Sequence, residues 1–534
     1  MRYQKYFFSL RSTLFLALIL MPTLALSTTY WFTRFGNSLP NVYTCGSAVQ
    51  ACAAGDQYIE SFDHIDVRVS TSPNIANTLC EGTYFITTWS DPIPAELSYT
   101  LANAGLCDCP SGTAEDSSGQ CVETKLEPDH KQPNEGCTPK VGDPIIVATG
   151  NSFQTEVDYQ SLNPFGLSFI RYYNSSSNAV DKGVGKKWRH QYNYKVDVIG
   201  DLALVRRSTG QTFIFNYDGS NWQSDVDIPD TLVELKDTAG NRIGWVYTDS
   251  HDNVERYNLS GQLIYITNRQ GQAKVLNYDI AVIDGGDGNN ATLDKVTGFN
   301  NEVMTFTYDA SNRISGMTDP QGNIYLYTYD SASNLIKVTY PDNTAGDDTD
   351  NPTRTYHYEN ATFPYHLTGR TDETGSLVTW AFDSQGRAIS NELASGTEKY
   401  TLVFNADDSV TTTNPLGKDT TYHFTTLHGV KKVTQVEGHA SQSCVAANKN
   451  YSYDANGYLA SKTDWQGKVT TYVHDARGLE TSRTEAFGTT EARTITTDWH
   501  ATFRLPIKIT EPGKVTDYSY DAQGRLTSQT VSTP

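Results

Sequence analysis

Aromatic residues recur two positions apart in short stretches of the C-terminal half of the chain. Residues with this spacing lie on one face of a β-strand, so each pair predicts a strand with an aromatic stripe on one side. The clearest pairs are Tyr451 and Tyr453, Tyr472 and His474, and Tyr518 and Tyr520.

An aspartate directly follows each aromatic pair, and a glycine follows three positions later. An Asp side chain bonds the backbone ahead of it and Gly supplies a positive φ, so the two predict a tight turn. An apolar residue and a threonine come next and predict a return strand, which makes each unit a β-hairpin. The turn residues are Asp454 and Gly457, Asp475 and Gly478, and Asp521 with Gly524 and Arg525.

The hairpin unit recurs along the chain. Asp454, Asp475, Asp498 and Asp521 fall 21, 23 and 23 residues apart, and a period of this size indicates a repeat architecture. An ordinary β-sandwich with Tyr-rich strands is the alternative, but sandwiches do not keep a fixed period. The same pattern occurs upstream at Tyr308 and Asp309, at Tyr329 and Asp330, and at Phe382 and Asp383 with Gly386.

With these motifs the chain resembles the Rhs, or YD-repeat, proteins. Residues 453–457 (Tyr-Asp-Ala-Asn-Gly) and 520–526 (Tyr-Asp-Ala-Gln-Gly-Arg-Leu) look like the core motif of that family. Residues 142–151, 167–175 and 185–192 are similar to landmarks of the domain that precedes the repeats in many of its members. The resemblance extends from about Lys140 to the end of the chain.

The resemblance implies an all-β fold in which antiparallel hairpins lie side by side in a large, curved and spiralling sheet, as part of a hollow shell. We expect a signal peptide over residues 1–27 and a cysteine-rich module with a linker over 28–139. A pre-repeat β domain is expected over 140–200, degenerate repeats over 201–300 and YD repeats over 301–534.

The N-terminus predicts export. Arg2, Lys5 and Arg11 precede a short apolar run over residues 14–20, and small residues at 25–27 offer a cleavage site. The run is too short for a membrane span, with a signal anchor as the alternative. No other apolar stretch approaches membrane length, so we expect a soluble mature chain that is secreted or held in the bacterial cell envelope.

Seven of the eight cysteines lie between residues 28 and 139. After an export signal this density predicts disulfides in an oxidising compartment, although zinc is an alternative and the pairing stays open, with distant Cys444 as one possible partner. The candidates are Cys45, Cys52, Cys80, Cys107, Cys109, Cys121 and Cys137.

Composition supports a β-rich, turn-rich protein, with 33 Tyr and 40 Gly in 534 residues. The net charge of −20 argues against nucleic acid as a partner, because phosphate contacts need basic patches. The acidic stretches 284–290 and 341–352 have calcium binding as an alternative, but we interpret them as loops.

No catalytic, phosphate-binding or dinucleotide-binding motif occurs in the sequence, so we expect no enzyme activity, no cofactor and no metal site. Arg189 and His190 are interpreted as packing around Trp188, because the sequence fixes no nucleophile or carboxylate partner for them. Residues 319–322 (Asp-Pro-Gln-Gly) resemble part of a self-cleavage motif of some family members, but they fall at a mid-chain turn and the activity is not carried over.

Family members commonly enclose a C-terminal toxin, and we expect this chain to lack both the toxin and the region that closes the shell. The resulting hypothesis is an exported, non-catalytic scaffold, a partial shell related to polymorphic-toxin proteins. The alternative is a cell-surface module that recognises a glycan or a protein through its aromatic stripes. We also expect self-association, or binding of a separately encoded partner, through the C-terminal edge of the sheet.

Overall fold

The computed structural model describes residues 130–132, 138–279, 292–342, 350–394, 396–440 and 446–533, together with the backbone of seven short strands between Thr29 and Glu123. Every regular element in these residues is a β-strand. The chain divides into two compact units, one made mainly of residues 1–125 and the other mainly of residues 126–534.

The first unit contains three small antiparallel sheets. They are formed by β1 (Thr29–Arg34) with β2 (Asn37–Thr44), by β3 (Asp66–Val69), β4 (Glu81–Thr87) and β5 (Leu97–Thr100), and by β6 (Thr113–Glu115) with β7 (Cys121–Glu123). The predicted signal peptide lies outside the described residues, and so do the side chains of all seven candidate disulfide cysteines. Export and disulfide formation therefore stay predictions.

The second unit begins with a five-stranded sheet whose order is β12-β11-β10-β9-β8. Its strands are β8 (Lys140–Val141), β9 (Ile145–Ile146), β10 (Asn151–Gln160), β11 (Ser168–Asn174) and β12 (Trp188–His190). Ile146, Phe153 and Tyr172 pack together in its core.

A 30-stranded sheet follows, in which each strand pairs with its neighbours in the chain from β13 to β42. The outermost strands β13 and β42 do not pair with each other, so the sheet is open. The predicted all-β array of antiparallel hairpins is confirmed. The strands are β13 (Lys195–Ile199), β14 (Leu202–Arg206), β15 (Thr212–Tyr217), β16 (Trp222–Ser224), β17 (Thr231–Lys236), β18 (Arg242–Thr248), β19 (Val254–Tyr257), β20 (Leu263–Thr267), β21 (Ala273–Asp279), β22 (Thr292–Thr297), β23 (Val303–Tyr308), β24 (Ile314–Thr318), β25 (Ile324–Tyr329), β26 (Leu335–Thr339), β27 (Thr353–His357), β28 (Gly369–Thr371), β29 (Leu377–Phe382), β30 (Ala388–Leu393), β31 (Tyr400–Phe404), β32 (Val410–Thr413), β33 (Asp419–Leu427), β34 (Val430–Gly438), β35 (Ala447–Tyr453), β36 (Leu459–Thr463), β37 (Val469–His474), β38 (Glu480–Glu485), β39 (Arg493–Trp499), β40 (Pro506–Glu511), β41 (Lys514–Tyr520) and β42 (Leu526–Ser532).

The hairpin turn is built by the Asp-x-x-Gly motif. At Asp454 the carbonyl oxygen accepts the Gly457 N–H (3.0 Å), and the Asp454 N–H donates to the Tyr458 carbonyl (2.9 Å). The carboxylate caps the same turn by accepting the N–H groups of Asn456 and Tyr458 at 3.0 and 2.9 Å. Gly457 has a φ of 81°, and the strand register shifts at Tyr453, as in a three-residue hairpin loop with a bulge.

The turn keeps this geometry where glycine is replaced. Asn312 and Ser333 stand three residues after Asp309 and Asp330, and they adopt φ values of 58° and 66°. The capping carboxylate therefore sets the conformation, and glycine only lowers its steric cost.

The assignment of Asp498 as a repeat aspartate is wrong. Asp498 lies inside β39 opposite Lys508, and His500 takes the turn position instead. The Nδ1 atom of His500 accepts the N–H groups of Thr502 and Phe503, each at 3.1 Å. The loop between β38 and β39 lengthens this repeat, so a search for aspartates alone selected a residue two positions too early.

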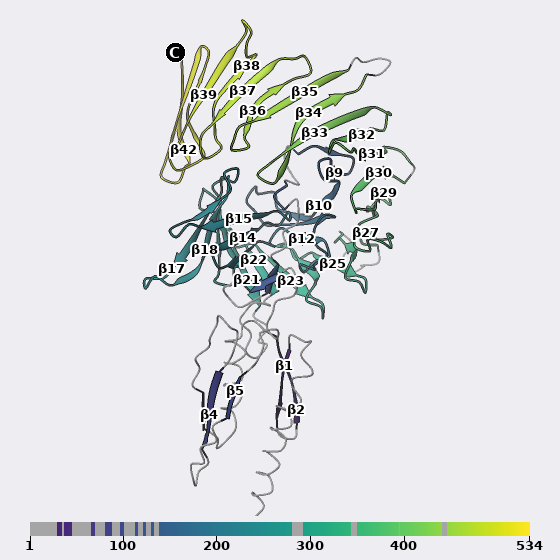
Figure 1. The fold of residues 1–534 in the computed structure, drawn as a ribbon, viewed down its shortest axis with the longest axis vertical. Coiled ribbons are helices and arrows are strands. Elements are labelled where there is room, and N and C mark those ends of the chain that lie inside the picture. The colour runs from purple at the N-terminus through teal and green to yellow at the C-terminus, as the bar shows by residue number, and fades with distance from the viewer. Residues whose placement is uncertain are drawn as a thin grey trace, which may run out of the picture. The chain divides into compact units, whose positions relative to one another are not determined.

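The long sheet coils back over itself, so that turns of its late strands lie on turns of its early strands (Figure 1). The Tyr458 hydroxyl donates to the Val226 carbonyl at 3.1 Å, and the Arg504 guanidinium donates to the Pro229 carbonyl at 2.7 Å. The Arg504 N–H also donates to the Asp252 carboxylate at 2.9 Å. These contacts join residues 232, 275 and 252 positions apart and give the spiral that the resemblance implied.

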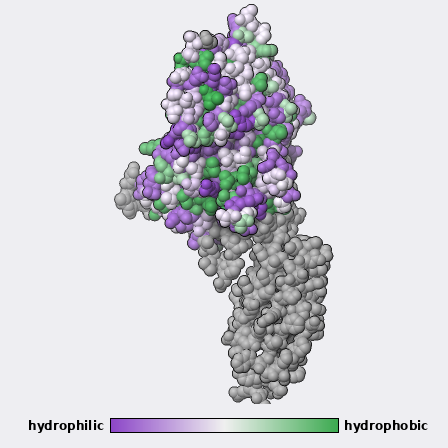
Figure 2. Space-filling view, turned by 90° about the vertical axis from the view of Figure 1, so that its left-hand side faces the viewer, coloured by the Kyte–Doolittle hydropathy of each residue, from purple (hydrophilic) through white to green (hydrophobic). Residues whose placement is uncertain are grey.

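The two faces of the long sheet differ along its early strands. The inner face packs on the five-stranded sheet and buries Phe306, Met317 and Val338, which are at most 6% exposed. The outer face carries threonines and the exposed aliphatic side chains of Ile324 and Leu326. On the side of the molecule shown in Figure 2, hydrophobic residues are scattered among hydrophilic ones.

Candidate functional site

Strand β10 directs three polar side chains at the inner face of the long sheet. Gln154, Glu156 and Asp158 alternate along the strand, and each is at most 8% exposed. Buried charges are costly unless they are paired, so their partners define this site.

Asp158 forms the centre of the interface. Its carboxylate accepts bidentate hydrogen bonds from Arg171 Nε (2.6 Å) and Nη2 (2.8 Å), and both side chains are fully buried. The hydroxyls of Tyr327 and Tyr340 donate to the same carboxylate at 2.8 and 3.0 Å. Burial, and then the Asp158 charge, raise the pKa of Tyr327 well above its ordinary value, so this hydroxyl stays a donor.

Glu156 and Asp143 extend the interface along the sheet. Glu156 pairs with Arg354 and with Arg370, whose Nη1 lies 2.9 Å away. Arg370 Nη2 also lies 2.7 Å from Asp143. Burial raises the pKa of the Asp143 carboxyl, while the Arg370 charge opposes that rise. We call these groups the anchor: Asp143, Glu156, Asp158 and Arg171 with Tyr327, Tyr340, Arg354 and Arg370.

Aromatic rings surround the anchor. Trp188 is fully buried, and its indole N–H donates to the Tyr358 hydroxyl at 2.8 Å. Phe169 packs between His190 and Phe306, with ring centroids 5.5 and 5.3 Å away. Burial lowers the pKa of His190 to about 3, so the ring is neutral at physiological pH. The structure therefore shows His190 packed in an aromatic layer.

The anchor was missed by sequence reasoning. Glu156 and Asp158 do carry a signal, because two acidic residues on one face of a predicted strand, beside apolar landmarks, indicate a buried polar row. Arg354 and Arg370 carry no such signal in the sequence, since they lie 198 and 214 residues from Glu156.

The predicted repeat residues hold hairpins together. The hydroxyls of four repeat tyrosines donate to backbone carbonyls of an earlier strand at 2.7–2.8 Å: Tyr308 to Leu293, Tyr329 to Ile314, Tyr453 to Val433 and Tyr520 to Pro506. Where arginine stands four residues after the aspartate, its Nε bonds the same carboxylate, as in Asp309 with Arg313, Asp383 with Arg387, and Asp521 with Arg525.

The remaining predicted residues occupy equivalent places. Asp330 and Asp475 cap their turns as Asp454 does, and the Phe382 ring lies 4.8 Å from His366. Gly386, Gly478 and Gly524 have φ values of 79°, 73° and 74°. These residues are spread over successive hairpins, and the structure does not bring them together into one site.

The inner face changes character along the sheet. Opposite the repeat aromatics, the early strands place the fully buried Met317 and Val338. The late strands place polar residues there, and their aromatics are only half-buried. We call this set the late inner face: Tyr451 opposite Lys462, Tyr472 opposite Arg483, and Tyr518 opposite Gln529.

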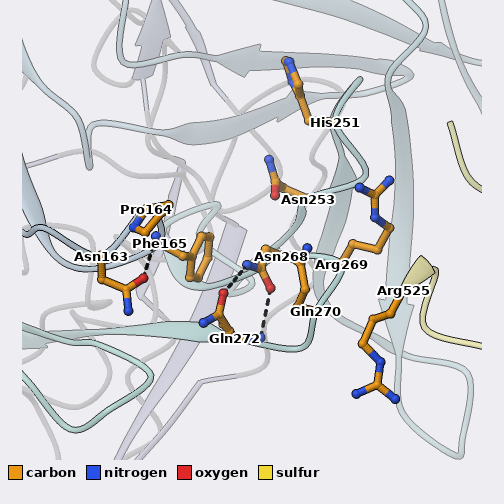
Figure 3. Close-up of a pocket in the computed structure, with 10 residues that line it drawn as sticks. All are labelled: Asn163, Pro164, Phe165, His251, Asn253, Asn268, Arg269, Gln270, Gln272 and Arg525. Atoms are coloured by element: carbon orange, nitrogen blue, oxygen red, sulfur yellow. Dashed lines mark hydrogen bonds between the residues drawn. The ribbon is translucent and has the colours of Figure 1, made fainter. Parts of the chain in front are cut away.

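An open pocket of about 730 Å³ lies elsewhere on the same unit (Figure 3). Its lining comes from the loop before β11, from two turns of the early repeats and from the last hairpin. The lining residues are Asn163, Pro164, Phe165, His251, Asn253, Asn268, Arg269, Gln270, Gln272 and Arg525.

The described residues contain neither a candidate metal cluster nor a membrane-spanning helix. No group of three or more His, Cys, Asp or Glu side chains there could hold a metal ion. No helix in the same part of the chain is long and apolar enough to cross a membrane. The acidic stretch 284–290 and residues 343–349 lie outside the described residues, so their interpretation as loops stays a prediction.

Comparison with solved structures gives distant similarities. The crystal structure of TcdB2-TccC3-Cdc42 is 13% identical, with a TM-score of 0.37, and the match covers 74% of this chain and 22% of that chain. The crystal structure of TcdB2-TccC3 is 11% identical, with a TM-score of 0.34, and the match covers 86% of this chain and 26% of that chain. The present chain thus spans about a quarter or less of their length. A comparison with curated proteins gives no match.

Two family models match the chain, one in a single region and the other in three. A domain of unknown function, DUF6531, matches residues 142–215, which include β10, β11 and β12 with the first strands of the long sheet. The RHS repeat matches residues 308–345, 453–490 and 505–533, each of which starts at or near a hairpin described above. With these matches and with hairpins paired in sequence order, the chain contains RHS, or YD, repeats.

Proposed function

We propose that this chain is an exported, non-catalytic RHS scaffold, a partial shell related to polymorphic-toxin proteins, whose late inner face receives a separate partner. The change of the inner face along the sheet carries the proposal. The anchor fills the early inner face with the chain's own five-stranded sheet, whereas Lys462 and Arg483 stand at the equivalent late positions.

The late inner face fits a polar partner. Lys462 lies 5.7 Å from the centroid of the Tyr472 ring, and Arg483 pairs with Glu480 and Glu485 at 3.1 and 3.2 Å. Half-buried aromatics beside charges are typical of interfaces, where a ring supplies contact area and its polar neighbours supply specificity. A partner with acidic and aromatic side chains would complete these contacts.

The edge of β42 supports a second contact. All seven residues of this strand are exposed, and among the described strands it pairs with β41 alone. An edge with unpaired backbone groups accepts another strand. We propose that β42 is extended by a strand from a second copy of the chain or from a separately encoded partner.

Site-specific photo-crosslinking tests the proposal in the producing bacterium. A benzoylphenylalanine replaces Tyr472 on the inner face or Val473, which is 58% exposed on the outer face of the same strand. The expected result is an adduct with one protein at position 472 and none at position 473. Equal labelling at both positions, or none at either, would contradict a partner on the late inner face.

Export is tested on the same material. The intact mass of the extracytoplasmic protein should lack roughly the first 25–27 residues, as cleavage of a signal peptide requires. Retention of Met1 on exported protein would contradict the proposal.

The second candidate function is a cell-surface module that binds a glycan through its aromatic stripe. The half-exposed rings of Tyr451, Tyr472 and Tyr518 favour it. The same crosslinking experiment separates the two candidates, because a polysaccharide adduct at position 472 supports the surface module and a protein adduct supports the scaffold.

A further inference from the structure

The pocket in Figure 3 is composite, because its walls come from parts of the chain that only the coiled sheet brings together. Asn163 and Phe165 form one side, from the loop between β10 and β11. Asn268 and Gln272 lie in the middle, on the turn between β20 and β21. Arg525, from the last hairpin, borders the other side together with Arg269.

The lining is rich in amides and contains no carboxylate. The Asn268 side chain bonds Gln272 twice, since its Nδ2 donates to the Gln272 side-chain oxygen (2.7 Å) and its Oδ1 accepts the Gln272 N–H (3.0 Å). Gln270, at the tip of the same turn, is exposed and forms no hydrogen bond to a described residue. A side-chain amide offers donors and an acceptor together, which matches a ligand that carries many hydroxyls.

The two arginines give the pocket a cationic side. Each has one nitrogen bound to a carboxylate outside the lining: Arg269 Nη1 lies 3.2 Å from Asp252, and Arg525 Nε lies 2.6 Å from Asp521. In earlier repeats the equivalent arginines lie over aromatic rings, with Arg387 3.9 Å from the centroid of Phe404. Arg525 has no such ring among the described residues and its side chain is 62% exposed, so its terminal nitrogens remain available.

Phe165 supplies an aromatic wall. The ammonium group of Lys274 lies 4.9 Å from the ring centroid, and the ring also lines the pocket. A single aromatic ring among amides suits the C–H face of a pyranose. A peptide would need an apolar anchor pocket or a strand edge, and this lining offers neither.

We infer that this pocket binds an anionic saccharide, with the amides on its hydroxyls, Phe165 against a sugar ring, and Arg525 on its carboxylate or sulfate. Guanidinium groups bind planar oxyanions through two parallel hydrogen bonds. The volume falls in the usual range for small-molecule sites, about 300–1,000 Å³. The inference does not depend on the scaffold role, since the pocket and the late inner face share no residue.

Calorimetric titration of the full chain with defined sugars tests this inference. The probes are trigalacturonate, a sulfated disaccharide, neutral maltotriose and citrate. We expect binding of at least one acidic sugar and not of maltotriose or citrate, with weaker binding at high salt because the charges are screened. The two acidic probes distinguish a carboxylate ligand from a sulfate ligand.

Variants of the lining residues test whether the sugar binds in the pocket. Arg525→Gln and Phe165→Ala should each weaken it about tenfold, the size of one lost charge-assisted hydrogen bond or ring contact. Gln270→Ala should weaken it less, and Gln466→Ala is its matched control, because Gln466 holds the same place in the Asp464–Gly467 turn outside the pocket. Three results would overturn the inference. They are an affinity that does not change in Arg525→Gln and Phe165→Ala, equal binding of maltotriose or citrate, and no binding of either acidic sugar.

Discussion

Asp158 and Arg171 lie fully buried between two sheets, where a charge without its partner would be strongly destabilising. Bidentate geometry and tyrosine hydroxyls compensate both charges, and among the described residues only Arg171 Nη1 is left without a hydrogen bond in this pair. Such a pair contributes little net stability compared with an apolar contact of the same shape, but it penalises every other alignment of the two sheets. At the scale of single residues, the anchor specifies how the five-stranded sheet is aligned on the long sheet.

The first prediction concerns this pair. Asp158→Ala leaves the Arg171 charge buried without its partner and should lower the free energy of unfolding by about 3–5 kcal/mol. Urea denaturation followed by tryptophan fluorescence measures the change. Glu491→Ala is the control, because Glu491 is exposed and 3.9 Å from Lys468, and it should stay within about 0.5 kcal/mol. Similar losses in both variants would contradict the role of the anchor.

The second prediction concerns pH. Burial lowers the pKa of His190 to about 3 and that of His366 to about 4, below the value of about 6.5 in the unfolded chain. Below pH 6.5 the unfolded state therefore binds more protons than the folded state, and stability falls as the pH falls toward the folded pKa values. Each histidine should lower the free energy of unfolding by about 2 kcal/mol as the pH falls from 7.5 to 5.

Urea titrations of wild type and of His190→Gln at both pH values measure this cost. The variant should lose about 2 kcal/mol less than wild type over the interval. An identical pH dependence in the two proteins would show that His190 does not titrate on unfolding.

The sequence predicts the repeat residues well because their contacts are local. Asp454 bonds groups two and four residues ahead, so spacing alone reveals its role. Asp498 was misassigned because spacing does not register a longer loop. The partners of Asp158 were not predictable, since Tyr327 and Tyr340 lie 169 and 182 residues away.

At the scale of elements, a tyrosine hydroxyl and a backbone carbonyl tie several hairpins to the strand before them, as at Tyr308, Tyr329, Tyr453 and Tyr520. The Tyr453 hydroxyl lies 2.7 Å from the Val433 carbonyl in β34. The hairpin period, the strand direction and the turn positions other than the one at His500 follow from the sequence. The packing of β10 and β11 against the inner face does not follow from the sequence, because it depends on how strongly the long sheet curves.

The third prediction separates the two tyrosines of β35. Tyr453→Phe removes the hydroxyl bonded to Val433 and should cost about 1 kcal/mol, with faster hydrogen exchange in β34 and β35. Tyr451→Phe is the matched control, because Tyr451 lies on the same face of the same strand without a hydroxyl contact to a described residue. Equal exchange rates in the two variants would contradict the tie between hairpins.

At the scale of the whole repeat unit, stability does not come only from neighbouring hairpins. A simple repeat array has contacts between adjacent repeats alone, and its stability is a sum of such terms. Here Arg504 and Tyr458 connect turns that are more than 200 residues apart, so the coiled sheet contains a second set of contacts between its late and early parts.

The fourth prediction concerns these contacts. Arg504→Ala removes the hydrogen bonds to Pro229 and Arg477, and it should expose residues 226–230 to faster hydrogen exchange and to proteolysis. The strands on either side should keep their protection. Arg493→Ala is the control, because among the described residues Arg493 forms its ion pairs with Glu485 and Glu511 on neighbouring strands alone. Unchanged exchange at 226–230 would show that the contacts between the late and early parts do not depend on Arg504.

The long sequence separation within the anchor also sets an order of assembly for a chain that emerges with its N-terminus first. Glu156 emerges 214 residues before Arg370, which is about 10–40 s of synthesis at typical elongation rates. During that interval the polar row of β10 stays in water, and the five-stranded sheet cannot dock. Docking therefore becomes possible only after the early hairpins have emerged. The early part of the long sheet is thus present before the five-stranded sheet packs against its inner face.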